Sequence, residues 1–258
     1  MNSLITKPGV HVLILLGAIA SFVFFQFFYP YHLFYQEQNQ LFLFSWDYIT
    51  TYLDKPGWLA CLTGDFLTQF YYYRYAGPTI LTLSILMAGY NVRCGVEDAD
   101  IKGTWIPYTI AIAVMTMLVC FSLHYDYRLS SIIAIAGGAN VFRFSTKILV
   151  STRMSIKKLE NQALRHTSID GTRLPQWITA VSIFISMLVC HWFFGCGMWI
   201  YAALVLLGCI KYINKPGNYT RLAAITIPLF IIILDKRLYF IDFHTLYTYP
   251  GLGKFVKP

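Results

Sequence analysis

Charged side chains are scarce in this chain of 258 residues. Asp, Glu, Lys and Arg make up only 12% of it, whereas 57% of the residues are hydrophobic and 17% are aromatic. Soluble domains devote about a quarter of their residues to charge. So few charges cannot cover the surface of a soluble fold, which excludes an ordinary cytosolic enzyme, a disordered chain and a disulfide-stapled secreted domain. The composition predicts an all-α, polytopic integral membrane protein that is partnered by the lipid bilayer.

Paired cysteine motifs and nucleic-acid signatures are also missing. None of the six cysteines forms a Cys-x-x-Cys pair, which argues against a zinc or thioredoxin-like site. Cys190 and Cys196 flank a predicted tight turn and could pair across it, although both also fit as unpaired thiols. The net charge of +8 comes without a basic stripe, a zinc finger or an RNA-binding motif. We therefore expect no nucleic-acid partner.

Long apolar runs predict about seven membrane-spanning helices within a single transmembrane domain, residues 1–258. Each run is near or slightly below the ~20 residues that cross a bilayer. Lys7 and the apolar run after it resemble a signal peptide, but no charged residue occurs from Pro8 to Tyr31, which favours a span. The predicted spans are Gly9–Tyr29, Ala76–Val92, Thr104–Leu123, Arg128–Phe144, two helices within Leu174–Ile210 that Gly195-Cys196-Gly197 separates, and Arg221–Leu234.

The distribution of Lys and Arg predicts the orientation. Most of them fall in segments that share one side, and the densest is the basic segment 144–173. Basic loops stay in the cytoplasm. We therefore expect a bacterial inner-membrane protein with a cytoplasmic N-terminus and an outer, periplasmic C-terminal tail, residues 238–258. The basic segment fits either a solvated loop or a helix that binds anionic lipid headgroups at the membrane surface.

The first predicted outer loop, residues 31–75, is too long for a simple connection and too apolar for a free one. Its hydrophobic residues recur at helical spacing, and a break follows at Asp54-Lys55-Pro56-Gly57. We expect two amphipathic helices in the membrane interface, where Tyr and Trp are favoured. The first is carried by Phe34, Leu41, Phe44, Tyr48 and Tyr52, and the second runs from about Trp58 to Tyr73.

Polar residues gather at the predicted outer ends of the spans. Glu37 stands in a run of amide side chains just after the first span. Four of the six histidines also fall on this side, and Asp126 follows one of them closely. These groups could form a metal or acid/base site, or they could be interfacial residues with no shared role. The four histidines are His32, His124, His191 and His244.

Two stretches carry a resemblance to a known family. At YHLFYQEQNQLFLF and FLTQFYYYRYAGP the chain resembles an uncharacterised family of polytopic inner-membrane proteins of Bacteroidota. The resemblance covers roughly the first 95 residues, and the remainder agrees only in hydropathy. Family members tend to be longer, so the chain would be a short member or an N-terminal half. The resemblance implies no catalytic residue.

The layout of the chain also resembles that of GT-C-type membrane glycosyltransferases, which move a sugar from a polyprenyl-phosphate lipid. Those enzymes carry an acidic residue in a long first outer loop, and Glu37 occupies a comparable place. The chain lacks an Asp-x-Asp pair in that loop and a large outer domain. The likeness implies Glu37 as general base and His124 and Asp126 as catalytic groups or ligands of a divalent metal. Arg74, Arg128 and His32 would bind the substrate.

Two other functions fit the sequence. The aromatic outer loop offers a wide apolar surface, which suits a non-catalytic scaffold or subunit that docks an envelope-assembly protein. A transporter is the third hypothesis for the function. Transporters often carry charges in mid-membrane or show inverted repeats. Here the predicted spans carry no charge in mid-membrane and no repeat is visible, which argues against a transporter.

Overall fold

The computed structural model of the protein describes residues 3–40, 42–53, 55–99, 103, 105–163, 176–210 and 223–228. Every regular element within these ranges is helical, as the composition predicts, and none is a strand. Most of the predicted seventh span, the tail 238–258 and His244 lie outside the described residues. The helices are α1 (Ser3–Val23), α2 (Pro30–Asn39), α3 (Trp46–Leu53), α4 (Trp58–Thr68), α5 (Ala76–Asp98), α6 (Ile106–Phe121), α7 (Leu129–Ala163), α8 (Gln176–Phe194) and α9 (Gly197–Ile210).

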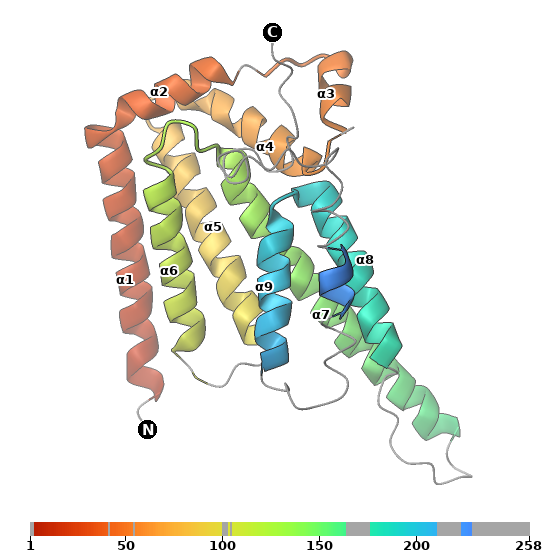
Figure 1. The fold of residues 1–258 in the computed structure, drawn as a ribbon. Helices are drawn as coiled ribbons and strands as arrows, with labels where there is room; N and C mark the ends of the chain where they lie inside the picture. Colours follow the sequence, from red (N-terminus) through yellow and green to blue (C-terminus); the bar gives the residue numbers. More distant parts are fainter. Residues whose placement is uncertain are drawn as a thin grey trace.

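Helices α1, α5, α6, α7, α8 and α9 run along the length of the bundle, whereas α2 and α4 lie across one end of it and α3 stands beside α4 at that end (Figure 1). We call this the capped end. Helix α7 packs against α4, α5, α8 and α9 and so forms the centre of the bundle. Its contact with α9 depends on glycine, because a Cβ added at Gly138 would overlap the carbonyl oxygen of Gly197. Small residues at such crossings allow two backbones to approach closely.

The sequence predicted seven membrane spans, but fewer of the described helices are long and apolar enough to cross a membrane. By length and composition, Ala76–Asp98 and Leu129–Thr152 could each cross a bilayer. A third candidate joins Val12–Phe28 to Pro30–Asn39, which are bent by 78° at the break between them. Three further apolar helices are shorter: Ile106–Phe121, Ile178–Phe194 and Gly197–Cys209. The described helices therefore provide two candidate spans, or three if the bent pair counts as one.

The predicted first interfacial helix is two helices in the structure. Helix α1 ends in a single π-helical stretch, Phe24–Phe28, and the chain then turns sharply into α2, which begins at Pro30. Helix α2 ends at Asn39, and α3 begins only at Trp46. The prediction of one helix through Tyr52 was therefore wrong. The predicted break before the next helix is confirmed, since Gly57 has a φ of 80° and α4 starts at Trp58.

Helix α7 is much longer than the predicted fourth span, which ended at Phe144. It runs for 35 residues, from Leu129 to Ala163, so that part of the basic segment 144–173 belongs to the same helix. The sequence from Ala139 to Ala163 contains no glycine or proline. The charge of Arg143 limits a run of apolar residues, but it does not break a helix. Figure 1 shows this end of α7 reaching past the neighbouring helices, away from the capped end.

The hairpin between α8 and α9 forms where the sequence predicted it. Gly195 has a φ of 52°, in the left-handed region that favours glycine, and α9 begins two residues later. Cys190 and Cys196 are both free thiols in the structure, so the pair that flanks this turn forms no disulfide.

Candidate functional site

Helix α4 carries an acidic residue into the interior at the capped end. Its buried face is built from small side chains together with Asp65. A Cβ added at Gly64 would lie 2.6 Å from Cα of Ser130, so α4 rests directly on the first turn of α7. Asp65 follows Gly64 and is only 5% exposed. The close approach of these two helices is what removes its carboxylate from solvent. The other buried residues of this face are Ala60, Cys61 and Thr68.

The carboxylate of Asp65 is held by two other elements. The hydroxyl of Tyr52, on α3, donates a hydrogen bond of 2.7 Å to Oδ2 of Asp65. Nη1 of Arg128, just before α7, lies 4.0 Å from Oδ1. The hydroxyls of Tyr48 and Tyr52 are 2.7 Å apart, and Tyr48 is half-buried. We call Tyr48, Tyr52, Asp65 and Arg128 the outer polar cluster; it runs from the surface of the cap to a buried acid.

Burial sets the electrostatics of this cluster. Desolvation raises the pKa of the Asp65 carboxyl, and the nearby Arg128 and the hydrogen bond from Tyr52 only partly offset it. Desolvation also raises the pKa of Tyr52, which keeps its hydroxyl protonated as a donor. Oδ1 of Asp65 accepts no hydrogen bond from any described residue. Asp65 is therefore an acid that holds its proton more readily than a surface carboxylate and has one oxygen available to accept a further hydrogen bond.

Helix α2 is fixed against the loop between α6 and α7, residues 122–128. His32 is fully buried, and its ring stacks on Tyr29 at 5.1 Å and packs against Tyr125 at 4.8 Å. Nε2 of Gln36 donates a hydrogen bond of 2.7 Å to the carbonyl oxygen of Tyr127. Nε2 of Gln36 also lies 3.1 Å from Nε2 of His32. These contacts tie α2 to the loop whose last residue, Arg128, reaches Asp65.

The structure brings some of the predicted site residues together and leaves others apart. His32 lies against the 122–128 loop, which carries His124 and Asp126, both exposed. Glu37 is half-buried on α2, one residue after Gln36. Arg74 is exposed before α5, and its guanidinium lies 5.7 Å from the ring of its neighbour Tyr75. Of the predicted substrate-binding residues, Arg128 is the one placed beside a buried acid.

A metal site of three protein ligands does not form among the described residues. No group of three His, Cys, Asp or Glu side chains is placed there to hold an ion. His191 is buried near the end of α8, and His244 lies outside the described part of the chain. The predicted histidine constellation is therefore not assembled by the residues that the structure describes.

The sequence did contain a signal for Asp65 that charge counting misses. In WLACLTGDFLT, residues 60, 61, 64, 65 and 68 fall on one helical face, and the others on this face are Ala, Cys, Gly and Thr. Small residues on one face indicate close helix packing. An acid on such a face is buried with them, and buried acids require partners. Tyr52 and Gln36 carry no comparable signal.

The fold and the site together define a helical protein with helices long and apolar enough to cross a membrane and a buried acid beside a cation at one end. The chain belongs to a family of unknown function (DUF6057), whose profile matches residues 5–256. This agrees with the expectation of an uncharacterised family. No curated protein and no solved structure matches the chain.

Proposed function

We propose that the protein is a multi-pass protein of the bacterial inner membrane, with a cytoplasmic N-terminus and its capped end at the outer face. The candidate spans support the membrane location. Figure 1 supports a common orientation, because the start of α1 and the basic end of α7 lie at the same end of the bundle, opposite the cap. Basic segments favour the cytoplasmic side. The capped end would then face the periplasm.

At this outer face we propose a transferase of GT-C-like layout that acts on a sugar linked to polyprenyl phosphate. The observation that carries the proposal is the buried Asp65, bonded to Tyr52 and placed beside Arg128. Asp65 lies in the long first outer loop, where the layout requires an acid. It would replace Glu37 as the first choice for the general base.

The chemistry assigns each member of the outer polar cluster a task. Asp65 takes the proton from an acceptor hydroxyl, whose oxygen then attacks the anomeric carbon of the sugar. The bond from that carbon to the lipid phosphate breaks, and the leaving phosphate gains a negative charge that Arg128 balances. The protonated Asp65 then donates to Tyr52, Tyr52 to Tyr48 and Tyr48 to water, so that both hydroxyls reverse their hydrogen-bond direction as the proton moves to the surface. The Asp65 carboxylate is restored for the next cycle.

The other predicted residues keep supporting roles in this proposal. Glu37 is the second candidate base, and Arg74 would contribute to donor binding. His32 is fully buried, so it would act only by holding α2 against the 122–128 loop. His124 and Asp126, on the exposed loop, would help to hold a divalent cation. A magnesium ion does not need three protein ligands, since it is usually bound by one or two carboxylates together with substrate phosphates and water.

Substrate turnover tests the proposal. The full chain is purified in nanodiscs and incubated with polyprenyl-phosphate sugars and a mixture of glycan acceptors that carry free hydroxyls, and lipid binding and sugar transfer are measured. Asp65→Asn should abolish transfer while leaving binding intact, and Arg128→Gln should weaken binding. Asp47→Asn, an exposed acid on α3, is the matched control and should behave as wild type. Wild-type protein that neither binds nor cleaves any such lipid contradicts the transferase.

A scaffold for cell-envelope assembly is the second candidate, and a specific observation favours it. Large aromatic side chains stand exposed on the cap, with Tyr31 at 82%, Phe44 at 79% and Trp46 at 72% of their full exposure. A rim of this kind suits docking of an envelope-assembly protein as well as contact with lipid headgroups. Affinity purification from native membranes separates the two functions. A partner that is retained by wild type and lost when all three residues become alanine supports the scaffold.

A further inference from the structure

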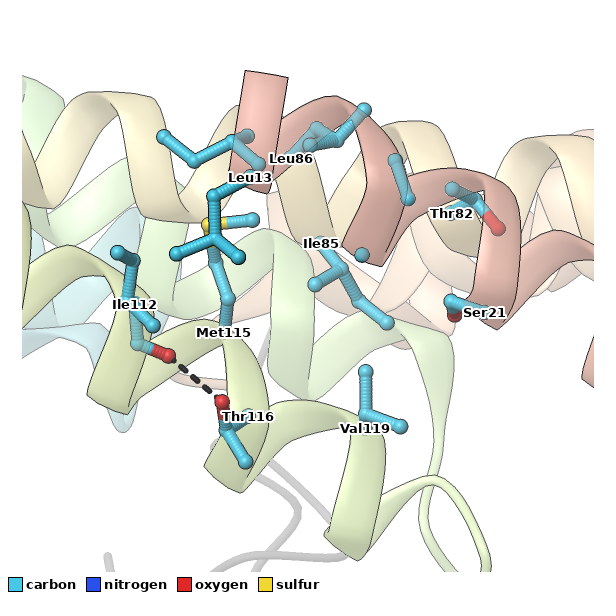
Figure 2. A pocket seen from close by; sticks show the side chains of 12 residues that line it. Leu13, Ser21, Thr82, Ile85, Leu86, Ile112, Met115, Thr116 and Val119 are labelled. Carbon is cyan, nitrogen blue, oxygen red and sulfur yellow. Dashed lines mark hydrogen bonds between the residues drawn. The ribbon is translucent and has the colours of Figure 1, made fainter. Parts of the chain in front are cut away.

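An apolar cavity lies between α1, α5 and α6 (Figure 2). Its volume is about 110 Å³, and side chains from all three helices line it. Leu13 stands at its border and is 57% exposed, so the cavity opens toward the outside of the bundle. Thr82 lines it six residues after the first residue of α5, which corresponds to about 9 Å along the helix axis.

The face of α1 that borders the cavity is made of small residues. Gly17, Ala18 and Ser21 fall on one side of the helix and all line the cavity. In membranes, small residues three or four apart usually let a second helix approach closely. Here a Cβ added at Gly17 would meet no atom within 4 Å. The small face of α1 therefore borders open space, and no described helix of this chain fills it.

The neighbouring helices are tightly packed, which limits the open space to the face of α1. A Cβ added at Gly89, one turn beyond Ile85 on α5, would overlap the sulfur of Met115 on α6. Helices α5 and α6 are therefore in close contact where they meet. The cavity is a defined gap between this pair and α1, and it is not a sign of loose packing throughout the bundle.

Two hydroxyl groups at the cavity have no hydrogen-bond partner among the described residues. They belong to Ser21 on α1 and Thr82 on α5, and Thr82 is only 8% exposed. Thr116, which lines the same cavity, instead donates a hydrogen bond of 2.9 Å to the carbonyl oxygen of Ile112, as Figure 2 shows. A hydroxyl left unpaired in an apolar environment is unfavourable. The pair indicates a ligand that carries an acceptor oxygen.

We propose that this cavity holds one acyl chain of a bilayer phospholipid, with its ester carbonyl oxygen accepting a hydrogen bond from Thr82 and Ser21. The volume of about 110 Å³ is smaller than the roughly 150 Å³ that takes up a benzene molecule, so the cavity fits a short segment of one hydrocarbon chain, with the rest of the chain outside the bundle. A helix is far too large for it. The depth also fits when α5 begins at the outer surface of the headgroup layer. This layer is about 5–8 Å thick, so hydroxyls about 9 Å below the start of α5 lie just inside the hydrocarbon, next to the ester groups. The proposal does not depend on the transferase.

Photo-crosslinking tests the proposal with the full chain in nanodiscs. The bilayer contains phosphatidylethanolamine and phosphatidylglycerol, with a small fraction of phosphatidylethanolamine that carries a diazirine in one acyl chain. Crosslinked peptides are identified by mass spectrometry. We expect wild type to crosslink on α1, α5 and α6 at the residues that line the cavity. Gly17→Leu fills the cavity and should lose these crosslinks. Gly9→Leu adds the same side chain where a Cβ also meets nothing, away from the cavity, and should retain them.

A second variant guards against a Gly17→Leu protein that does not fold. Thr82→Val keeps the side-chain shape and removes the hydroxyl, and it should lower crosslinking about fivefold when the probe lipid is limiting. Equal crosslinking in Gly17→Leu and Gly9→Leu overturns the proposal, as does a Thr82→Val protein that crosslinks as wild type does. Cavity crosslinks that appear only with a diazirine-bearing polyprenyl phosphate also overturn it, because the occupant would then be an isoprenoid chain.

Discussion

The hydroxyl of Tyr52 donates a 2.7 Å hydrogen bond to the carboxylate of Asp65, across the contact between α3 and α4. These two residues are 13 positions apart, and the left-handed Gly57 lies in the turn that leads from α3 into α4, so that the two helices meet. The bond secures α3 to the rest of the cap and gives the buried acid one of its partners. It is the structural centre of the proposed function.

Removing the Tyr52 hydroxyl should destabilise the protein. In Tyr52→Phe the Asp65 carboxylate keeps only the long contact to Arg128, and a buried acceptor that loses its donor costs about 1–3 kcal/mol. The thermal midpoint in detergent should fall accordingly. Tyr72→Phe, at an exposed position beyond α4, is the control and should change stability by less than about 0.5 kcal/mol. Equal midpoints for the two variants would contradict the role of this bond.

Stability should depend on pH through Asp65. Burial raises the pKa of its carboxyl in the folded protein above the unfolded value of about 3.9, so the folded state binds the proton more tightly. The stabilisation from the protonated form is complete below the unfolded pKa and is lost as pH rises through the folded pKa. The thermal midpoint of wild type relative to Asp65→Asn should therefore fall from pH 4 toward pH 7. A midpoint difference that stays constant over this range would contradict the assignment.

The contact between α4 and α7 should not tolerate a methyl group. In Gly64→Ala the new Cβ would meet the backbone of Ser130 at 2.6 Å, so α4 must shift, at a cost of about 1–3 kcal/mol. Gly208→Ala on α9 is the matched control, since its Cβ finds the nearest atom at 3.8 Å. That variant should gain up to about 1 kcal/mol from helix propensity. Thermal unfolding of both should shift in opposite directions, and a stabilised Gly64→Ala would refute the close packing.

The proposed orientation predicts opposite accessibility for the two ends of the bundle. Asp47→Cys on the cap should react with a membrane-impermeant maleimide in intact spheroplasts. Lys158→Cys, near the end of α7, should react only after the membrane is permeabilised. Wild type provides the background from the native cysteines. Reaction of both variants in intact cells would rule out the assigned topology.

Local backbone signals predicted the turns of this fold well, whereas helix ends without such signals were misjudged. Gly57 and Gly195 each adopt a left-handed conformation, and a helix begins directly or two residues after each, as expected. After Phe144, charge was taken as the end of the fourth predicted span, but α7 continues to Ala163 because charge does not end a helix. The gap between α2 and α3 carries neither glycine nor proline and was missed.

The candidate site shows a similar limit. Charge and position selected Glu37, His124 and Asp126, all of which the structure places at least partly in solvent. Asp65 lies in the same predicted loop as Glu37, but its burial depends on the contact of Gly64 with Ser130, which is 66 positions further along the chain. The small face of α4 indicates that this helix packs closely, but the local pattern does not show which helix it meets. Arg128 was selected from its charge, and its acidic partner emerged only from the fold.

The proposed role of Asp65 is tested by the rate at which polyprenyl phosphate is released from a polyprenyl-phosphate sugar in nanodiscs, in the presence of glycan acceptors, by wild type and by Asp65→Asn. We expect measurable release by wild type and a loss of at least about a hundredfold in Asp65→Asn, the range expected for a general base. Both proteins should still bind the lipid. Release at equal rates by the two proteins would contradict the role of Asp65, and no release by wild type would contradict the transferase itself.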